Sequence, residues 1–333
     1  MSDAAVAGRR LTAAEVADRL RRENHVLIVS HESPDGDALG CLSAFVLMCE
    51  RLGVPYLAYV PGEAPFPAEY QFLPRLHDVV RGAVPMLAPE TTVYLLDCAS
   101  LARGGFPVFG EGTTQVTIDH HQDNPGNADL NLLEPEAAAT TAFLYEIFRA
   151  GRFPIDAQIA ACLYVGLVTD TGRFQYSNTN PQAHRMAAEL QEIGLDVAAI
   201  SRQLYETVPL PKLRLLGVAL QRMEMKQGGV VVTSWLREED FAAAGADDSH
   251  AEGIIDTLRQ VRGAAVAVLA RERARGGGIE TKVSLRSMDG RVDVAAIAAV
   301  KGGGGHKQAA GFTTAGNATE VLQWTERQLQ SVL

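Results

Sequence analysis

The sequence is poor in cysteine, in aromatic residues and in positive charge. No Cys-x-x-Cys pair is present, and the cysteines lie in apolar stretches, at Cys41, Cys49, Cys98 and Cys162. This pattern excludes a disulfide framework and predicts that these cysteines are reduced residues of the core. Lys and Arg number 30 against 40 Asp and Glu, a net charge of −10. A protein that held long duplexes through phosphate contacts would have a basic surface. We therefore expect no duplex DNA partner, and the charge favours small anionic substrates held by metal ions and a few local cations.

Long apolar runs are missing as well. No stretch approaches the roughly 18 apolar residues that a membrane-spanning helix needs, and residues 1–10 lack the apolar segment of a secretory signal. We therefore expect a soluble, cytoplasmic protein with no membrane partner. With 333 residues, 47% of them hydrophobic, the chain is long for one core and fits two domains.

One polar loop lies between an apolar run and an amphipathic segment. Val26-Leu27-Ile28-Val29 predicts a buried strand, and apolar residues at helical spacing from Leu39 onward predict a helix that Gly53 ends. The loop between these elements carries His31, Asp35 and Asp37. One imidazole and two carboxylates can hold a divalent cation. For this loop taken alone, an acidic turn that caps a helix is the alternative.

Three further apolar elements end at acidic residues. Val93-Tyr94-Leu95-Leu96 stops at Asp97, and Val116-Thr117-Ile118 stops at Asp119-His120-His121. An apolar segment of helical length, residues 159–168, ends at Asp170. Open α/β sheets place ligands outside the carboxyl ends of their strands, so these side chains can project into one crevice. Four such endings favour a two-metal site over coincidence.

These residues resemble the DHH phosphoesterases, a family named for the triplet present here as Asp119-His120-His121. The segment His31-x3-Asp35-Gly36-Asp37-Ala38-x-Gly40 is similar to the first family motif, Asp97 to the second, the triplet to the third and Asp170 to the fourth. Gly302-Gly303-Gly304-Gly305-His306 resembles the signature of the DHH-associated C-terminal domain. The resemblance spans about residues 26–312. The length and the domain pair are similar to the nanoRNase and pAp-phosphatase branch, cytosolic enzymes that trim very short RNAs.

The predicted fold class is α/β, with an N-terminal, mostly parallel sheet flanked by helices and a smaller C-terminal α/β domain. Residues 1–200 are expected to form the DHH catalytic domain with its two-metal site. Residues 201–225 are expected to be a helical connector, and residues 226–333 the DHH-associated substrate-binding domain. The resemblance also implies a homodimer through the DHH domain.

The resemblance implies two metal ions, one held by His31, Asp35 and Asp97 and the other by Asp37, Asp97, His120 and Asp170. Asp97 would bridge the two ions. A ligand set of nitrogen and oxygen without thiolate suits Mn²⁺ best, with Mg²⁺ or Co²⁺ as alternatives, and Mn²⁺ is also what the resemblance implies.

The triplet would supply catalytic residues besides a ligand. His121 resembles the second triplet histidine of the family, which faces the phosphate and would stabilise its charge or protonate the leaving oxygen. Asp119 would orient an imidazole. Spacing alone does not say which histidine of the pair binds metal, so this assignment rests on the resemblance.

Substrate-binding residues are expected in both halves. Gly303 and Gly304 let backbone N–H groups approach an anion, and His306 adds a donor; a flexible turn is the alternative for the glycines. Arg286 matches a family position whose side chain faces the substrate. Arg103 follows Asp97 at a distance that can bring its guanidinium to a phosphate, or it is an ordinary solvated arginine.

Two aromatic residues, Phe174 and Tyr176, follow Asp170 in a polar loop. Aromatic rings can stack on the bases of a short single strand, and the alternative is that they pack under the loop. For at least one of them packing is the better interpretation.

The predicted function is Mn²⁺-dependent hydrolysis of oligoribonucleotides two to a few residues long to mononucleotides, with dephosphorylation of 3′-phosphoadenosine 5′-phosphate (pAp) as a second activity. The chain would be a phosphodiesterase, an exoribonuclease and a 3′(2′),5′-bisphosphate nucleotidase. Cleavage of a cyclic dinucleotide or of a linear dinucleotide is the alternative, since it would use the same residues. A non-catalytic nucleotide-binding protein is a further alternative. Such a protein would be expected to have lost some of the metal ligands, but every position that matches the family motifs carries a residue able to bind metal or act in catalysis.

Overall fold

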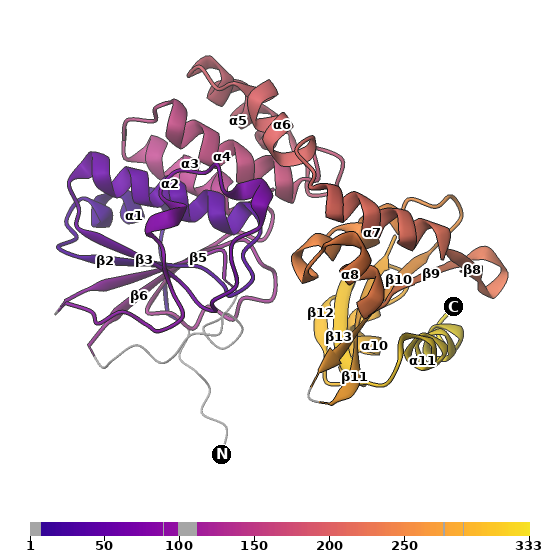
Figure 1. Cartoon of the computed structure of the whole chain (residues 1–333). Coiled ribbons are helices and arrows are strands. Elements are labelled where there is room, and N and C mark those ends of the chain that lie inside the picture. Colours follow the sequence, from indigo (N-terminus) through magenta and orange to yellow (C-terminus); the bar gives the residue numbers. More distant parts are fainter. Residues whose placement is uncertain (1–7, 89, 99–111, 276, 289) are drawn as a thin grey trace. The chain divides into compact units, whose positions relative to one another are not determined.

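The computed structural model describes residues 8–88, 90–98, 112–275, 277–288 and 290–333 (Figure 1). The chain divides into two compact units, Met1–Thr207 and Val208–Leu333. Each unit is built around its own sheet and its own core.

The first unit contains a seven-stranded sheet in which the described strands all pair in parallel. The strand order is β1-β7-β6-β5-β2-β3-β4. The strands are β1 (Arg9–Arg10), β7 (Leu130–Leu133), β6 (Thr114–Asp119), β5 (Thr92–Leu96), β2 (Val26–Val29), β3 (Tyr56–Val60) and β4 (Val80–Arg81). Strand β2, in the interior of the sheet, is buried along its whole length, as expected for a parallel strand covered on both faces.

Helices cover one face of this sheet, above the strands in Figure 1. They are α1 (Ala13–Leu20), α2 (Gly36–Leu52), α3 (Thr140–Ala150) and α4 (Ala157–Asp170). Their apolar side chains pack with alternate strand residues such as Ile28, Tyr94 and Ile118. The other face carries a smaller apolar cluster that includes Leu27 and Leu95. Two further helices, α5 (Pro181–Glu192) and α6 (Val197–Tyr205), follow α4 in the chain.

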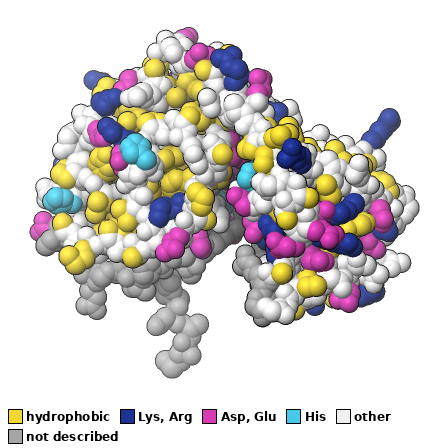
Figure 2. Space-filling model, viewed as in Figure 1, with side chains coloured by type: hydrophobic (Ala, Val, Ile, Leu, Met, Phe, Trp, Pro, Cys, Tyr) yellow, Lys and Arg dark blue, Asp and Glu magenta, His cyan; other side chains and the backbone are white. Residues whose placement is uncertain are grey.

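The second unit is a mixed six-stranded sheet in the order β12-β13-β11-β10-β9-β8. Its strands are β8 (Glu224–Lys226), β9 (Val231–Leu236), β10 (Val266–Arg275), β11 (Gly278–Ser287), β12 (Gly304–His306) and β13 (Ala309–Ala315). Its helices are α7 (Leu210–Gln221), α8 (Glu238–Ala244), α9 (Ile254–Leu258), α10 (Val294–Ala299) and α11 (Ala318–Gln330). Acidic and basic side chains are interleaved on the face of this unit seen in Figure 2, so that face offers no continuous basic track.

The predicted α/β class, with a mostly parallel first sheet and a smaller second α/β domain, is confirmed. Strand β6 ends at Asp119 and helix α4 ends at Asp170, so each of these acidic residues is the last residue of its element. The division between the units falls at Thr207 and Val208, between α6 and α7; a separate connector over residues 201–225 stays a prediction. Among the described helices, none has both the length and the apolar character needed to cross a membrane.

Candidate metal centre

The candidate site lies where the strand order of the first sheet reverses. The chain proceeds from β2 outward to β3 on one side, and from β5 outward to β6 on the other, while β2 and β5 are neighbours. Open α/β sheets form a crevice at such a switch point, outside the carboxyl ends of the strands. His31 follows β2, Asp97 follows β5 and His120 follows β6. The topology therefore brings together three side chains that are far apart in sequence.

One group of potential ligands consists of His31, Asp35 and Asp97, whose ligand atoms lie within 4.8 Å of one another. Nε2 of His31 is 4.0 Å from Oδ2 of Asp97. Asp35 is the N-cap of α2, where its Oδ1 accepts the backbone N–H groups of Asp37 and Ala38. This cap fixes the carboxylate at the start of the helix, in the field of the helix dipole.

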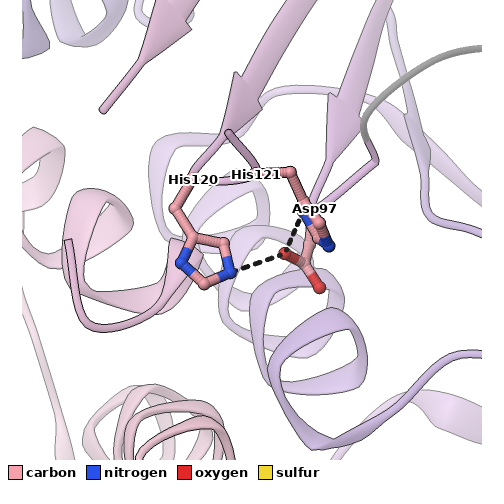
Figure 3. Close-up of side chains that lie close together, drawn as sticks. All are labelled: Asp97, His120 and His121. Carbon is pink, nitrogen blue, oxygen red and sulfur yellow. Dashed lines mark ion pairs between the residues drawn. The ribbon is translucent and has the colours of Figure 1, made fainter. Parts of the chain in front are cut away.

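A second group consists of Asp37, His120 and Asp170, again with ligand atoms within 4.8 Å. Nε2 of His120 lies 3.6 Å from Oδ2 of Asp170. The same nitrogen lies 3.7 Å from Oδ1 of Asp97 (Figure 3). Asp97 therefore presents one carboxylate oxygen toward each of two histidines, Oδ2 toward His31 and Oδ1 toward His120.

The backbone of Asp97 has a φ of 55°, in the left-handed region. Non-glycine residues rarely adopt this conformation, although Asp and Asn tolerate it better than others. Such conformations occur frequently at functional sites, where surrounding contacts impose them. Here the N–H of Asp97 donates to the carbonyl of Ile118 at 3.0 Å, which holds the turn after β5 against β6.

The tautomer of His120 suits a metal ligand. Its Nδ1 lies 3.2 Å from the backbone carbonyl of Ala137, and only a protonated Nδ1 can donate to that oxygen. The neutral ring then leaves Nε2 as the lone-pair nitrogen, and Nε2 is the atom that faces Asp97 and Asp170. A hydrogen bond from the opposite ring nitrogen is the usual way in which proteins orient a ligating histidine.

His121 has different partners, although it adjoins His120 and also lies near Asp97 (Figure 3). Its Nδ1 is 2.7 Å from Oδ1 of the buried Asp119. Oδ2 of Asp119 accepts a hydrogen bond from Nδ2 of Asn124 at 2.6 Å. Burial opposes ionisation of Asp119, but the hydrogen bonds and charge of His121 and the hydrogen bond of Asn124 lower its pKa below the usual value. Asp119 is therefore a carboxylate that holds the His121 ring and turns Nε2 away from itself.

The electrostatics of the cluster fit a cation. Burial raises the pKa of Asp97 well above its usual value, and the charges of Asp37 and Asp35 raise it further. Burial and the same two charges raise the pKa of Asp170 to about 9. Burial also raises the pKa of Asp37, against an opposing effect of His120. Buried carboxylates that repel one another are stabilised in their charged form by a divalent ion, which prefers such oxygen and imidazole ligands.

The first turn of α3 holds two of these carboxylates, a role that the sequence interpretation missed. Oγ1 of Thr141 donates to Oδ1 of Asp37 at 2.7 Å, and the N–H groups of Thr140 and Thr141 donate to its two oxygens at 2.5 and 3.0 Å. Oγ1 of Thr140 donates to Oδ1 of Asp97 at 2.8 Å. In the sequence, these two threonines indicate only the start of an apolar helix. A polar pair in an otherwise apolar segment was the signal that could have revealed this role.

Asn178 was missed as well. Its Nδ2 donates to the carbonyl of Asp170 at 3.1 Å, to Oδ2 of Asp170 at 3.3 Å and to the carbonyl of Ala138 at 2.9 Å. One amide therefore ties the end of α4 to the segment before α3. Its distance of eight residues from Asp170 carries no periodicity that sequence reasoning could have used.

Removal of the Thr141 hydroxyl should weaken metal binding more than it changes the fold. In Thr141→Val the shape of the side chain is kept, but Asp37 loses its donor at 2.7 Å. We expect the affinity for Mn²⁺ to fall by roughly tenfold, the lower range for a partner of a ligand, as measured by calorimetric titration. Thr325→Val is the matched control, because this buried threonine donates only to the carbonyl of Val321. Equal Mn²⁺ affinity in both variants would contradict the role of Thr141.

The substrate residues expected in the second unit lie on its β11-β13-β12 side. Ala309 of β13 pairs with Arg286 of β11 and with His306 of β12, so the three residues occupy one row. The Arg286 side chain is 26% exposed, and its Nε lies 3.3 Å from Oδ1 of Asp256. The side chain of His306 lies outside the described part of the structure, and so does Arg103.

The glycine run has a packing role in addition to any binding role. A Cβ on Gly303 would lie 2.2 Å from the carbonyl oxygen of Gly311, and one on Gly305 would lie 2.4 Å from that of Ala309. Close approach of β13 therefore requires glycine at both positions. A Cβ on Gly304 would meet nothing within 4 Å, so packing does not require glycine at this position. Packing, rather than a flexible turn, accounts for Gly303 and Gly305.

Comparison with known proteins identifies the family of the chain and its two domains. Residues 25–167 match the model of the DHH family, N-terminal domain, and residues 227–331 match that of the DHHA1 domain. The chain is 34% identical, over 311 residues, to the bifunctional oligoribonuclease and PAP phosphatase NrnA of Thermus thermophilus; the match covers 93% of this chain and 90% of that protein. The chain belongs to the DHH family. It is thus a phosphoesterase-family hydrolase, as its motifs predicted.

A second curated relative and one solved structure are also similar to this chain. The enzyme of the same name from Bacillus subtilis is 25% identical over 70% of this chain and 71% of its own length. Among solved structures, an exopolyphosphatase-related protein from Bacteroides fragilis superposes with a TM-score of 0.87 at 24% identity, and the match covers 96% of both chains. That likeness confirms the fold of this DHH chain.

Proposed function

We propose that the chain hydrolyses very short oligoribonucleotides to mononucleotides and also removes a phosphate from pAp. The observation that carries the proposal is the cluster of potential metal ligands around Asp97, which forms three overlapping groups: His31, Asp35 and Asp97; Asp37, His120 and Asp170; and Asp97, His120 and His121. Two neighbouring metal ions are typical of enzymes that hydrolyse phosphate esters. The relatives named as oligoribonucleases and PAP phosphatases support the choice of substrate class.

His31, Asp35 and Asp97 hold one ion in this proposal, and Asp37, Asp97, His120 and Asp170 hold the other. Mn²⁺ suits this set of imidazole and carboxylate ligands best, with Mg²⁺ and Co²⁺ as alternatives. The chemistry that a bound pair of such ions supplies is polarisation of the phosphate and activation of a water nucleophile.

The remaining residues act on the substrate or on the ligands. Oδ1 of Asp119 accepts a hydrogen bond from the Nδ1–H group of His121 and so fixes the ring with Nε2 available to the phosphate. From that position His121 stabilises negative charge on the phosphate oxygens or protonates the leaving oxygen. Thr140, Thr141 and Asn178 hold the ligand carboxylates in place.

The second unit binds the rest of the substrate in this proposal, through Arg286, the backbone at Gly303 and Gly304, and His306. Arg103 is retained as a further phosphate contact by resemblance alone. The division of labour between a catalytic domain over residues 1–200 and a binding domain over residues 226–333 is part of the same proposal. The homodimer stays a prediction, which the mass of the protein in solution tests directly.

Loss of Arg286 should affect substrates that are long enough to reach it. In Arg286→Ala we expect KM for a dinucleotide to rise by roughly tenfold, because one charge-assisted phosphate contact is removed. Turnover of a small phosphodiester without a nucleoside should stay within about twofold. Arg259→Ala is the matched control, since Arg259 also lies near Asp256. Equal losses on both substrates would show that Arg286 acts on the catalytic centre or on the fold instead.

The proposed function is tested by turnover of 5′-labelled RNAs two to ten nucleotides long, beside pAp and a cyclic dinucleotide, with Mn²⁺ and then with a chelator. Mn²⁺-dependent hydrolysis concentrated on dimers and trimers is the expected result. Consumption of the cyclic dinucleotide alone would assign the chain to the alternative activity. Binding without turnover of any of these substrates would overturn the proposal of an enzyme.

A further inference from the structure

The turn between α4 and α5 adopts an unusual backbone conformation next to the metal centre. Gly172, Arg173 and Phe174 have φ values of 55°, 62° and 62°, so three successive residues lie in the left-handed region. Arg173 and Phe174 are side-chain-bearing residues that seldom adopt it. Strain of this kind persists only where surrounding contacts impose it, and it concentrates at functional sites.

Contacts on every side fix this turn. The Phe174 ring stacks on His184 of α5, with centroids 4.9 Å apart and an interplanar angle of 26°. The Arg173 guanidinium lies 4.0 Å from the centroid of Tyr205. The carbonyl of Thr171 accepts the N–H groups of Gln175 and Tyr176, both at 3.0 Å. The turn is therefore a rigid element, and Phe174 is used for packing, as expected for one of the two aromatic residues.

The same turn is joined to a ligand of the metal centre. Asn178 donates to both the carbonyl and the carboxylate of Asp170. Asp170 in turn lies 3.6 Å from His120. Residues 170–178 thus join the turn directly to Asp170, one of the potential metal ligands.

The ring of Tyr176 belongs to the same turn. A Cβ built on Gly172 would lie 2.4 to 2.5 Å from three carbons of this ring, so the ring rests directly on the backbone of Gly172. The left-handed φ favours glycine there, and the contact with the ring requires it. Tyr176 nevertheless stays 43% exposed. The fold therefore holds a flat aromatic surface in place without burying it.

We propose that the Tyr176 ring is a stacking platform for a nucleobase of the substrate whose phosphate occupies the metal centre. This inference rests on the proposed function and adds the means by which the base is bound. Stacking on an aromatic ring accepts every base, because each base has a π face. It also adds affinity without phosphate contacts, which suits a chain with a net charge of −10.

Binding of 5′-AMP and of ribose 5-phosphate, each measured by calorimetry on the full chain with Mn²⁺, tests the platform without requiring turnover. The wild type should bind 5′-AMP at least about tenfold more tightly than ribose 5-phosphate. Tyr176→Ala should lose this difference with its affinity for ribose 5-phosphate unchanged, and Tyr176→Phe should retain it. Unchanged binding of 5′-AMP by Tyr176→Ala, or no preference for 5′-AMP in the wild type, would overturn the proposal.

Turnover separates this inference from the proposed function. On a dinucleotide, Tyr176→Ala should raise KM by roughly tenfold, whereas an analogue in which the stacked nucleoside lacks its base should be hydrolysed equally by the variant and the wild type. An equal loss on both substrates would mean that Tyr176 only supports the turn, and would contradict the platform. If the wild type hydrolyses neither substrate, the proposed function fails, while the binding comparison still decides the platform.

Discussion

Asp97→Asn should abolish most of the activity and leave the fold intact. Asp97 lies within 4.0 Å of His31 and 3.7 Å of His120, so the proposed ions share its carboxylate. The amide keeps an oxygen but loses the charge, and we expect kcat to fall by roughly 10³-fold or more on any phosphodiester. Asn tolerates the left-handed backbone at this position at least as well as Asp does, so the turn after β5 should be retained.

The thermal stability of the metal-free protein provides a second test of the role of Asp97. Asp97 has a side chain only 3% exposed, and burial together with neighbouring carboxylates disfavours its charge. Removal of that charge should leave the metal-free melting temperature unchanged or raise it, while Mn²⁺ should stabilise the variant less than the wild type. Asp156→Asn is the matched control, because Asp156 caps α4 and pairs with Arg51 at the surface. Full activity in Asp97→Asn would contradict the bridging role.

His121→Ala should lower kcat by roughly 10²- to 10³-fold, within the range for a group that transfers a proton or stabilises charge in the transition state. Its Nδ1 is engaged by Asp119 at 2.7 Å, so the ring is held by a carboxylate that is not among the proposed metal ligands. The affinity for Mn²⁺ should therefore change by less than about threefold, whereas His120→Ala should lower it by tenfold or more. Calorimetric titration beside steady-state kinetics measures both quantities.

The leaving group distinguishes the two roles left to His121. If the ring protonates the leaving oxygen, the loss in His121→Ala should nearly vanish on a p-nitrophenyl phosphodiester, whose leaving group needs no proton. If the ring stabilises charge on the phosphate, the loss should be similar for both kinds of substrate. Loss of Mn²⁺ binding in His121→Ala would contradict both, and would make His121 a ligand through its contact with Asp97.

The sequence predicted the parts of the molecule whose signals are local. The strand at Val26, the helix stop at Gly53 and the polar loop before α2 follow from apolar periodicity and from one left-handed glycine. The positions of the predicted ligands at the ends of β2, β5 and β6 follow from the rule that parallel strands share a carboxyl edge.

Contacts between distant segments were beyond the sequence. Thr140 and Thr141 donate hydrogen bonds to the ligand carboxylates, and Thr141 is more than 100 residues from Asp37 in the sequence. No periodic pattern in the sequence indicates such a contact. The left-handed backbone at Asp97 and at Arg173 and Phe174 is also invisible in the sequence, because it is imposed by tertiary contacts and not by residue type. The packing requirement at Gly303 depends on the close approach of β13.

The most direct test of the account is the location of the metal ions. A crystal of the protein grown with Mn²⁺ and measured at the Mn absorption edge should show two anomalous peaks, both within coordinating distance of the Asp97 carboxylate. One peak should adjoin His31 and Asp35, and the other Asp37, His120 and Asp170. A single peak, or two peaks of which only one contacts Asp97, would contradict the two-ion centre.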